Sequence, residues 1–106
     1  MGSVSIGNLT IATGRSVAIG DQAQALGTRS VAIGGYNNRN SRWTAANNEY
    51  SVAIGAGARS TFSRSVAIGA GAQTTSSDQI VLGTRDDVVY IPGRLVVDRT
   101  AVLGYG

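Results

Sequence analysis

Cysteine and histidine are absent from this 106-residue sequence, and proline occurs only once. The lack of cysteine excludes disulfides, thiolate nucleophiles and cysteine-based zinc sites. The lack of histidine removes the commonest general base and the commonest ligand for transition metals. No segment approaches the roughly 18 apolar residues that a membrane-spanning helix needs. We therefore expect a non-enzymatic protein of single-domain length, with no metal, no cofactor and no membrane insertion.

Charged side chains are also scarce, at 14% of the chain compared with roughly 25% in an average soluble domain. Nine basic residues, all arginine, against six acidic ones give a net charge of +3. Proteins that bind nucleic acids usually combine clustered basic residues with a recognisable module, and no such module is present. We interpret the arginines as solvated surface residues and expect no nucleic-acid partner.

An internal repeat dominates the sequence. The pentapeptide Ser-Val-Ala-Ile-Gly or a variant of it recurs six times, at residues 3–7, 16–20, 30–34, 51–55, 65–69 and 79–83. The starts are 13, 14, 21, 14 and 14 residues apart, which gives a period of 14 with one deletion and one seven-residue insertion. A short period of this kind is typical of solenoid folds, in which each repeat forms one coil.

Within the pentapeptide the branched residues alternate with small ones, which predicts a β-strand. Val17 and Ile19 would face one side, and Ser16, Ala18 and Gly20 the other. Each coil then reads as strand, turn, strand and turn, with successive coils stacked in parallel. The branched residues predicted to pack in the core or between chains are Val17, Ile19, Val31, Ile33, Val52, Ile54, Val66, Ile68, Ile80 and Leu82.

The face of small residues allows the backbone of another element to approach closely, so we expect it to press on a second layer or on another chain. Because a single coil buries little apolar surface, the stack needs further burial to be stable. A symmetric homo-oligomer is the natural solution, although the period alone does not fix the number of chains.

Residues 16–34 have the pattern Ser-Val-Ala-Ile-Gly-x-x-Ala-x-Ala-x-Gly followed by a second Ser-Val-Ala-Ile-Gly. This pattern resembles the head repeat of trimeric autotransporter adhesins of the YadA type, and the resemblance extends over about residues 3–83. It implies a left-handed parallel β-roll, three chains around one axis and a role in surface attachment. Similar repeats occur in bacteriophage tail fibres and spikes, where fibrous trimers meet the host surface.

The chain departs from that pattern in front of each serine, where the family usually has asparagine. This chain instead has Arg15, Arg29, Tyr50, Arg64 and Asp78. Consecutive coils would place Arg15 and Arg29 about 5 Å apart, where two positive charges repel each other. We expect these arginines to splay into solvent, to pair with Asp21 and Asp78, or to hold an anion, so Arg15, Arg29 and Arg64 are candidate ligand-binding residues.

The predicted fold is therefore all-β: a homotrimeric, left-handed parallel β-roll (β-solenoid) of 14-residue coils. We predict two parts, a roll of about six coils over residues 1–83 with an inserted loop at 35–50, and a segment over residues 84–106. In that segment, 88–91 and 95–97 read as strands around a Pro-Gly turn. They predict a hairpin-like cap or a transition to the next segment.

The insertion carries the only tryptophan, the only glutamate, two tyrosines and five asparagines of its region. Aromatic rings beside amides and arginines suit a glycan or a protein receptor. Equally, the tryptophan could fold back to cover the side of the roll, or the loop could contact another protein of the same appendage. The candidate ligand-binding residues are Tyr36, Asn38, Arg39, Arg42, Trp43 and Tyr50.

The sequence thus favours a non-enzymatic attachment module of a bacteriophage tail fibre or tail tip, located on the virion appendage, which binds a host glycan or protein receptor. One alternative is the head of a trimeric autotransporter adhesin on a bacterial surface. A second is a structural spacer or cap without a ligand. An enzyme that cleaves polysaccharide with paired carboxylates is the rival class. We expect no catalytic residues, because the acidic residues other than Asp86 and Asp87 are far apart in sequence.

Overall fold

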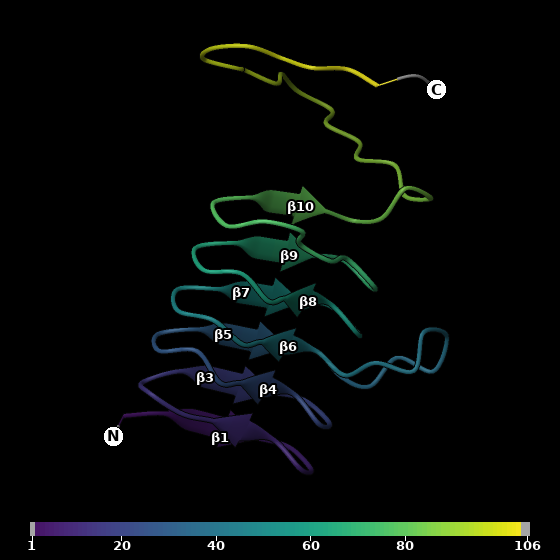
Figure 1. Cartoon of the computed structure of the whole chain (residues 1–106). Helices are drawn as coiled ribbons and strands as arrows, with labels where there is room; N and C mark the ends of the chain where they lie inside the picture. Colours follow the sequence, from purple (N-terminus) through teal and green to yellow (C-terminus); the bar gives the residue numbers. More distant parts are fainter. Residues whose placement is uncertain (1, 105–106) are drawn as a thin grey trace.

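The computed structural model describes residues 2–104 as a stack of coils with short parallel strands and no helix. Residues 1, 105 and 106, at the outer ends of the two predicted parts, lie outside the described residues. Figure 1 shows the coils rising from the N-terminus at the bottom to β10 at the top. The six strands of sheet A are β1 (Val4–Ile6), β3 (Val17–Ile19), β5 (Val31–Ile33), β7 (Val52–Ile54), β9 (Val66–Ile68) and β10 (Ile80–Leu82). The four strands of sheet B are β2 (Ile11–Ala12), β4 (Gln24–Ala25), β6 (Ala45–Ala46) and β8 (Arg59–Ser60).

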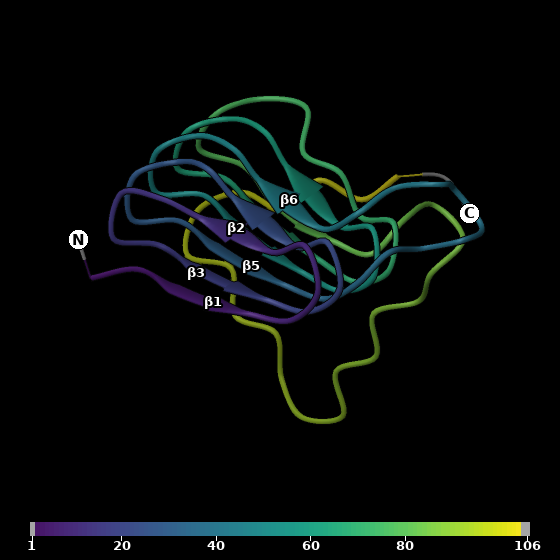
Figure 2. The same cartoon turned by 90° about the horizontal axis from the view of Figure 1, so that it is seen from below.

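The register of the strands follows the sequence repeat. In sheet A, Val17 pairs with Val31 and Ile19 with Ile33, and the 21-residue interval still brings Val31 opposite Val52. Every pairing within the two sheets is parallel, so each pentapeptide lies directly above its copy in the preceding coil. The predicted all-β parallel solenoid with 14-residue coils is therefore confirmed. Viewed along the stack, each coil is a flattened loop with the two sheets as its long sides (Figure 2).

The core of the roll consists of alanine and small hydroxyl residues. Ala18, Ala32, Ala53 and Ala67 from sheet A have no exposed surface, and Ala25 lies opposite them in sheet B. Because these side chains are so short, the two sheets approach each other closely. The small face of the pentapeptide thus presses on a second layer of its own chain, one of the two alternatives that the sequence left open.

The branched residues of the pentapeptide point the other way. Val and Ile alternate with the buried alanines and lie on the outer face of sheet A, partly or largely exposed in this single chain. Of the two roles predicted for them, they do not form the core of the single chain, and packing between chains remains a prediction. Only a small residue fits between the closely packed sheets, so the larger side chains must lie outside.

The serines of the four intact pentapeptides, Ser16, Ser30, Ser51 and Ser65, are buried, and the hydroxyl of each donates to a backbone carbonyl. The hydroxyl of Ser30 donates to the carbonyl of Gly27 at 2.6 Å, and that of Ser65 donates to the carbonyl of Phe62 at 2.6 Å. A serine here supplies a hydroxyl donor to a turn carbonyl inside the roll, and an alanine at the same place would remove that hydrogen bond. The repeat therefore needs both its alanine and its serine for the interior.

The glycine that ends each pentapeptide turns the chain where neighbouring coils touch through their backbones. Gly20 has a φ of 125°, and a Cβ on it would lie 1.8 Å from the carbonyl oxygen of Gly34. Neither the backbone conformation nor the space accepts a side chain at this place.

The insertion rejoins the roll earlier than predicted. Asn37 and Arg42 form an antiparallel bridge, with the Asn37 amide 2.7 Å from the Arg42 carbonyl oxygen, and the loop projects beyond the outline of the coils (Figures 1 and 2). Thr44 is fully buried, and Ala45–Ala46 already forms β6. The irregular part is thus about 35–43 rather than 35–50.

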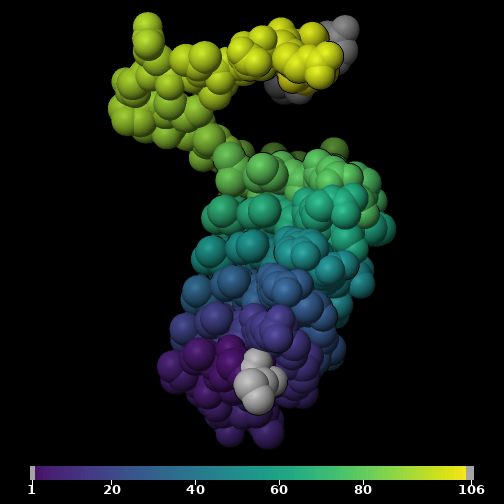
Figure 3. All heavy atoms as spheres, turned by 90° about the vertical axis from the view of Figure 1, so that its left-hand side faces the viewer, coloured from purple at the N-terminus to yellow at the C-terminus, as the bar shows by residue number. Residues whose placement is uncertain are grey.

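No strand forms among the described residues after Leu82. The strands expected at 88–91 and 95–97 are therefore wrong for the single chain. A strand requires a backbone partner, and Figure 3 shows this segment arching away from the last coil instead of lying on it. Its apolar residues remain exposed, among them Val88 and Val102 at 89% each. The division of the chain near residue 83 remains a prediction.

Candidate functional site

The outer face of sheet B carries the residues that combine aromatic, amide and cationic side chains. One column in register along the coils consists of Ile11, Gln24, Ala45, Arg59 and Gln73. Two positions earlier in each of the first three coils are Leu9, Gln22 and Trp43. The insertion therefore delivers its tryptophan onto a flat sheet face beside the column.

A hollow of about 480 Å³ lies on this face, lined by Leu9, Thr10, Ile11, Gln22, Gln24 and Trp43. Its size falls in the range usual for small-molecule sites. Two side-chain amides, a hydroxyl and an indole ring provide hydrogen-bonding groups and a stacking surface. None of the lining side chains is charged.

On the other side of the tryptophan lies Arg59, from the next coil. Its guanidinium carbon is 5.4 Å from the centre of the Trp43 ring, within the range of a cation–π interaction. Partial burial lowers the pKa of Arg59, and the positive charge of Arg42 lowers it further. Arg42 donates to Oε1 of Gln73 at 2.7 Å. Trp43 is thus positioned between two arginines and the hollow.

The indole nitrogen of Trp43 is buried and has no hydrogen-bond partner. Buried tryptophan N–H groups usually find an acceptor, because an unmade hydrogen bond costs free energy. The ring is therefore held in place by packing and by Arg59, and not by a hydrogen bond of its own. Trp43 therefore folds back onto the side of the roll, which is one of the alternatives that the sequence left open.

The other insertion residues do not join this hollow. Tyr36, Asn38 and Arg39 lie in the exposed loop, where the backbone amide of Arg39 donates to the side-chain oxygen of Asn37 at 2.9 Å. The Asn37 amide in turn donates to the carbonyl of Ala56 at 3.1 Å, which fastens the loop to the following coil. The structure thus separates Tyr36, Asn38 and Arg39 from Trp43.

The residues in front of the pentapeptide serines form a separate column at one corner of the roll. Arg29 lies over the ring of Tyr50, with its guanidinium carbon 5.9 Å from the ring centre and Nη1 3.4 Å from the hydroxyl. Arg64 donates to both carboxylate oxygens of Asp78, at 2.7 and 3.2 Å. This pairing lowers the pKa of Asp78 and raises that of Arg64. Of the three alternatives that the sequence left open, Arg64 takes the pairing with Asp78, whereas Asp21 accepts from the side chain of Asn8.

All five residues of this corner column have a positive φ, between 52° and 63°. Asparagine and glycine adopt this conformation most readily, which explains the preference of the repeat pattern for asparagine. An arginine at this place carries a backbone cost. The column members are Arg15, Arg29, Tyr50, Arg64 and Asp78.

A third surface is the apolar outer face of sheet A, where valine and isoleucine side chains are stacked in register from coil to coil. Val52 pairs with Val66 and Ile54 with Ile68, and both isoleucines are more than a third exposed. No charged residue belongs to the sheet A strands. An in-register apolar face of this extent is unusual on a protein surface that stays in water.

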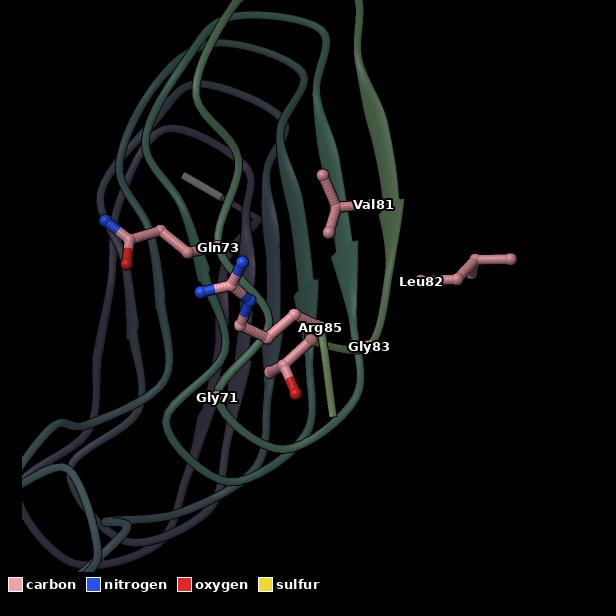
Figure 4. A pocket seen from close by; sticks show the side chains of 7 residues that line it. Gly71, Gln73, Val81, Leu82, Gly83 and Arg85 are labelled. Carbon is pink, nitrogen blue, oxygen red and sulfur yellow. The ribbon is translucent and has the colours of Figure 1, made fainter. Parts of the chain in front are cut away.

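The C-terminal end of the roll is open. A hollow of about 590 Å³ lies there, and Figure 4 shows Val81 pointing toward the interior of the last coil while Leu82 points away from it. Gln73, Thr84 and Arg85 also line this hollow. β10 is the last strand of sheet A, so its outer edge has no strand partner among the described residues.

No group of three or more histidine, cysteine, aspartate or glutamate side chains capable of holding a metal ion occurs within residues 2–104. Asp87 accepts hydrogen bonds from the amide and hydroxyl of Thr84 at 2.7 and 3.1 Å, which closes a turn. The described residues contain no helix that is long and apolar enough to cross a membrane.

The sequence pointed to Trp43 and Arg42 but missed the residues around them. Those residues are Leu9, Thr10, Ile11, Gln22, Gln24, Arg59 and Gln73. Their positions could have been found by aligning the coils across the 13-, 14- and 21-residue intervals. In that alignment, the outward-facing residues of the second strand of each coil form one column, and Trp43, near the end of the insertion, falls beside it.

Comparison with protein families matched residues 14–37 and 46–72 to the YadA head domain repeat, in two copies. Comparisons with curated proteins and with solved structures gave no match. The predicted YadA-type repeats are thus confirmed. Such repeats imply an adhesion module like that of trimeric autotransporter adhesins. YadA-type domains are surface-exposed, form homotrimers and are not known as enzymes.

Proposed function

Since the chain carries two copies of the YadA head domain repeat, we propose that it is a non-enzymatic, homotrimeric attachment module of a bacteriophage tail fibre or tail tip that contacts the host surface. The observation that carries this proposal is the presence of two different outer faces on opposite sides of the roll. The outer face of sheet A is apolar, and that of sheet B is polar and aromatic. One face suits contact between chains, and the other suits contact with a ligand.

The trimer is supported by the stacked valines and isoleucines. Three chains that bring these faces together around one axis would remove a continuous apolar stripe from water, at a gain of roughly 25 cal/mol for each Å² buried. The faces are identical, so rotational symmetry repeats the same contacts three times. Sheet B and the insertion would then remain on the outside of the trimer.

The ligand-binding face is supported by the chemistry of the insertion. Trp43 lines the hollow on the outer face of sheet B, Arg42 precedes it in the chain, and Tyr36, Asn38 and Arg39 lie in the exposed loop of the same insertion. Aromatic and arginine side chains of this kind are enriched where proteins bind partners. A host glycan or protein receptor is the partner that we propose, with other proteins of the same appendage at the ends of the roll.

At the corner column, Tyr50 and Arg29 are held together, and Arg64 is held by Asp78. Only Arg15 has no side-chain partner among the residues that the structure describes. The corner column is therefore a weaker candidate for an anion than the sequence alone indicated, and we propose it as a secondary contact surface.

The segment 84–106 is proposed as the cap or transition at the open end of the roll. It starts beside the end hollow and exposes a series of large apolar side chains over its described part. Deletion of residues 88–106 tests this role. The shortened protein should aggregate or melt at a lower temperature, whereas unchanged solubility and melting would contradict the proposal.

Binding to intact cells tests the proposed setting. The labelled protein should bind to bacterial cells of a susceptible strain and block adsorption of a phage that carries the chain. Binding to animal extracellular matrix in place of bacteria would favour the alternative, the head of a bacterial adhesin. If it binds neither, with the trimer intact, the spacer reading would be correct.

A further inference from the structure

We infer that the hollow beside Trp43 is a saccharide subsite that takes a neutral pyranose with an N-acetyl group. This inference deepens the proposed attachment function and rests on it, because it names the chemistry that the outer face of sheet B would recognise. The residues that line the hollow and its lack of charge both favour such a ligand.

The lining favours a sugar. An indole ring offers a flat surface on which the C–H face of a pyranose can stack. Gln22 and Gln24 are both half-buried beside it, and each amide can donate and accept a hydrogen bond. Neither side chain has a hydrogen-bond partner among the described residues, so both amides are available to sugar hydroxyls or to an acetamide group.

The charge of the hollow favours a neutral ligand. All six lining side chains are uncharged, and the guanidinium of Arg59, which stacks on the Trp43 ring, is not among them. An acidic sugar buried here would have no direct partner for its carboxylate, and an unpaired buried charge is unfavourable. Uronic and sialic acids are therefore poorer ligands for this hollow than neutral sugars.

The apolar part of the lining favours an N-acetyl group. Leu9 and Ile11 line the hollow and are 70% and 44% exposed. Hydroxyl groups gain nothing from contact with such side chains, whereas an acetamide methyl removes apolar surface from water. The adjacent Gln22 and Gln24 are placed to bind the amide of the same group.

The ring face of Trp43 is the part that a sugar can contact. Its indole nitrogen is buried and therefore does not donate to a ligand. Arg59 stacks on one side of the ring and leaves the side toward coils one and two to the ligand.

Titration with tri-N-acetylchitotriose tests the inference in the full chain. Trp43 is the only tryptophan, so its fluorescence reports on this hollow alone. We expect a saturable change in emission with the N-acetylated trisaccharide, at least tenfold weaker binding of maltotriose, and no saturable effect of glucuronic acid. Absence of saturation with the N-acetylated sugar, or equal affinity for maltotriose, would overturn the inference.

Variants separate this subsite from the rest of the surface. Gln24→Ala should weaken binding of the trisaccharide tenfold or more while the melting temperature stays unchanged, because Gln24 makes no side-chain hydrogen bond in the chain. Ser76→Ala is the control, at an exposed position outside the lining of the hollow, and should bind like the parent protein. Equal affinity of Gln24→Ala and the parent protein would overturn the inference.

The same variants distinguish failure of the subsite from failure of the proposed function. A trimer that binds host cells equally well with and without Gln24→Ala would overturn the saccharide subsite and leave the attachment role standing. A monomer that binds the trisaccharide through Gln24 would instead support the subsite and contradict the trimeric attachment module.

Discussion

Ile54 of β7 and Ile68 of β9 lie directly opposite each other in adjacent parallel strands, and both point away from the alanine core. Side chains on one face of neighbouring strands are close enough to pack together. The pair belongs to a stripe that runs along the whole of sheet A and that one chain leaves in contact with water. The stripe is the basis of the proposed trimer.

The first prediction concerns this stripe. Ile54→Asp should convert the trimer into a monomer, because threefold symmetry would place three carboxylates in an apolar interface. The mass in solution, measured by light scattering, reports the change. Gln73→Asp adds the same charge on the outer face of sheet B and should leave the mass unchanged. A trimeric Ile54→Asp protein would show that the interface lies elsewhere.

The second prediction concerns the contact between coils at Gly20. Gly20→Ala should destabilise the roll by at least about 3 kcal/mol, because the new methyl group collides with the Gly34 backbone and the φ of 125° is strained for alanine. Denaturant unfolding measures the loss. Gly93→Ala, where a Cβ meets nothing within 4 Å, is the control and should unfold like the parent protein.

The third prediction concerns the buried serine hydroxyls. Ser30→Ala should cost about 0.5–1.5 kcal/mol of stability, because the Gly27 carbonyl loses the closer of its two donors, the Ser30 hydroxyl, and keeps the Ser30 backbone amide at 3.2 Å. Ser76→Ala, at an exposed turn, should change stability by less than about 0.5 kcal/mol. Equal unfolding midpoints for the two variants would show that the interior hydrogen bond contributes nothing.

The fourth prediction concerns the strained corner column. Arg15→Asn should stabilise the chain by about 0.5–1 kcal/mol, since asparagine tolerates a φ of 63° better than arginine does. Arg29→Asn should gain little, because it also loses the contact with the Tyr50 ring, worth about 0.5–1 kcal/mol. Thermal unfolding of both variants checks the difference. A loss of stability in Arg15→Asn would contradict this account.

The sequence predicted the coil, its period and its parallel register, because the pentapeptide repeats almost without change and alternates strictly. It did not predict which face of the strand lies inside. Valine and isoleucine are usual core residues, yet Ala18 and Ser16 fill the interior here because the two sheets are too close for larger side chains. The repeat determines the register of the strands, whereas the distance between the two sheets determines whether the large or the small side chains point into the roll.

Trp43 illustrates the limit for the candidate site. The composition of the insertion indicated a contact surface. The neighbours of Trp43, however, are Gln24 and Arg59, which belong to other coils and have no distinctive pattern in the sequence. Stacking brings together residues that are about 20 and 16 positions away from it in the chain. In the segment around Tyr90 the sequence predicted strands that the structure does not contain. Its residues are typical of strands, but no strand among the described residues pairs with them.

The measurement that tests the central claim most directly is the molar mass of the full chain in solution at low concentration. Light scattering should give three times the 10.8 kDa mass of one chain, as expected if the apolar faces of sheet A meet around a threefold axis. A folded monomer at that concentration would contradict the trimer and, with it, the proposed attachment module.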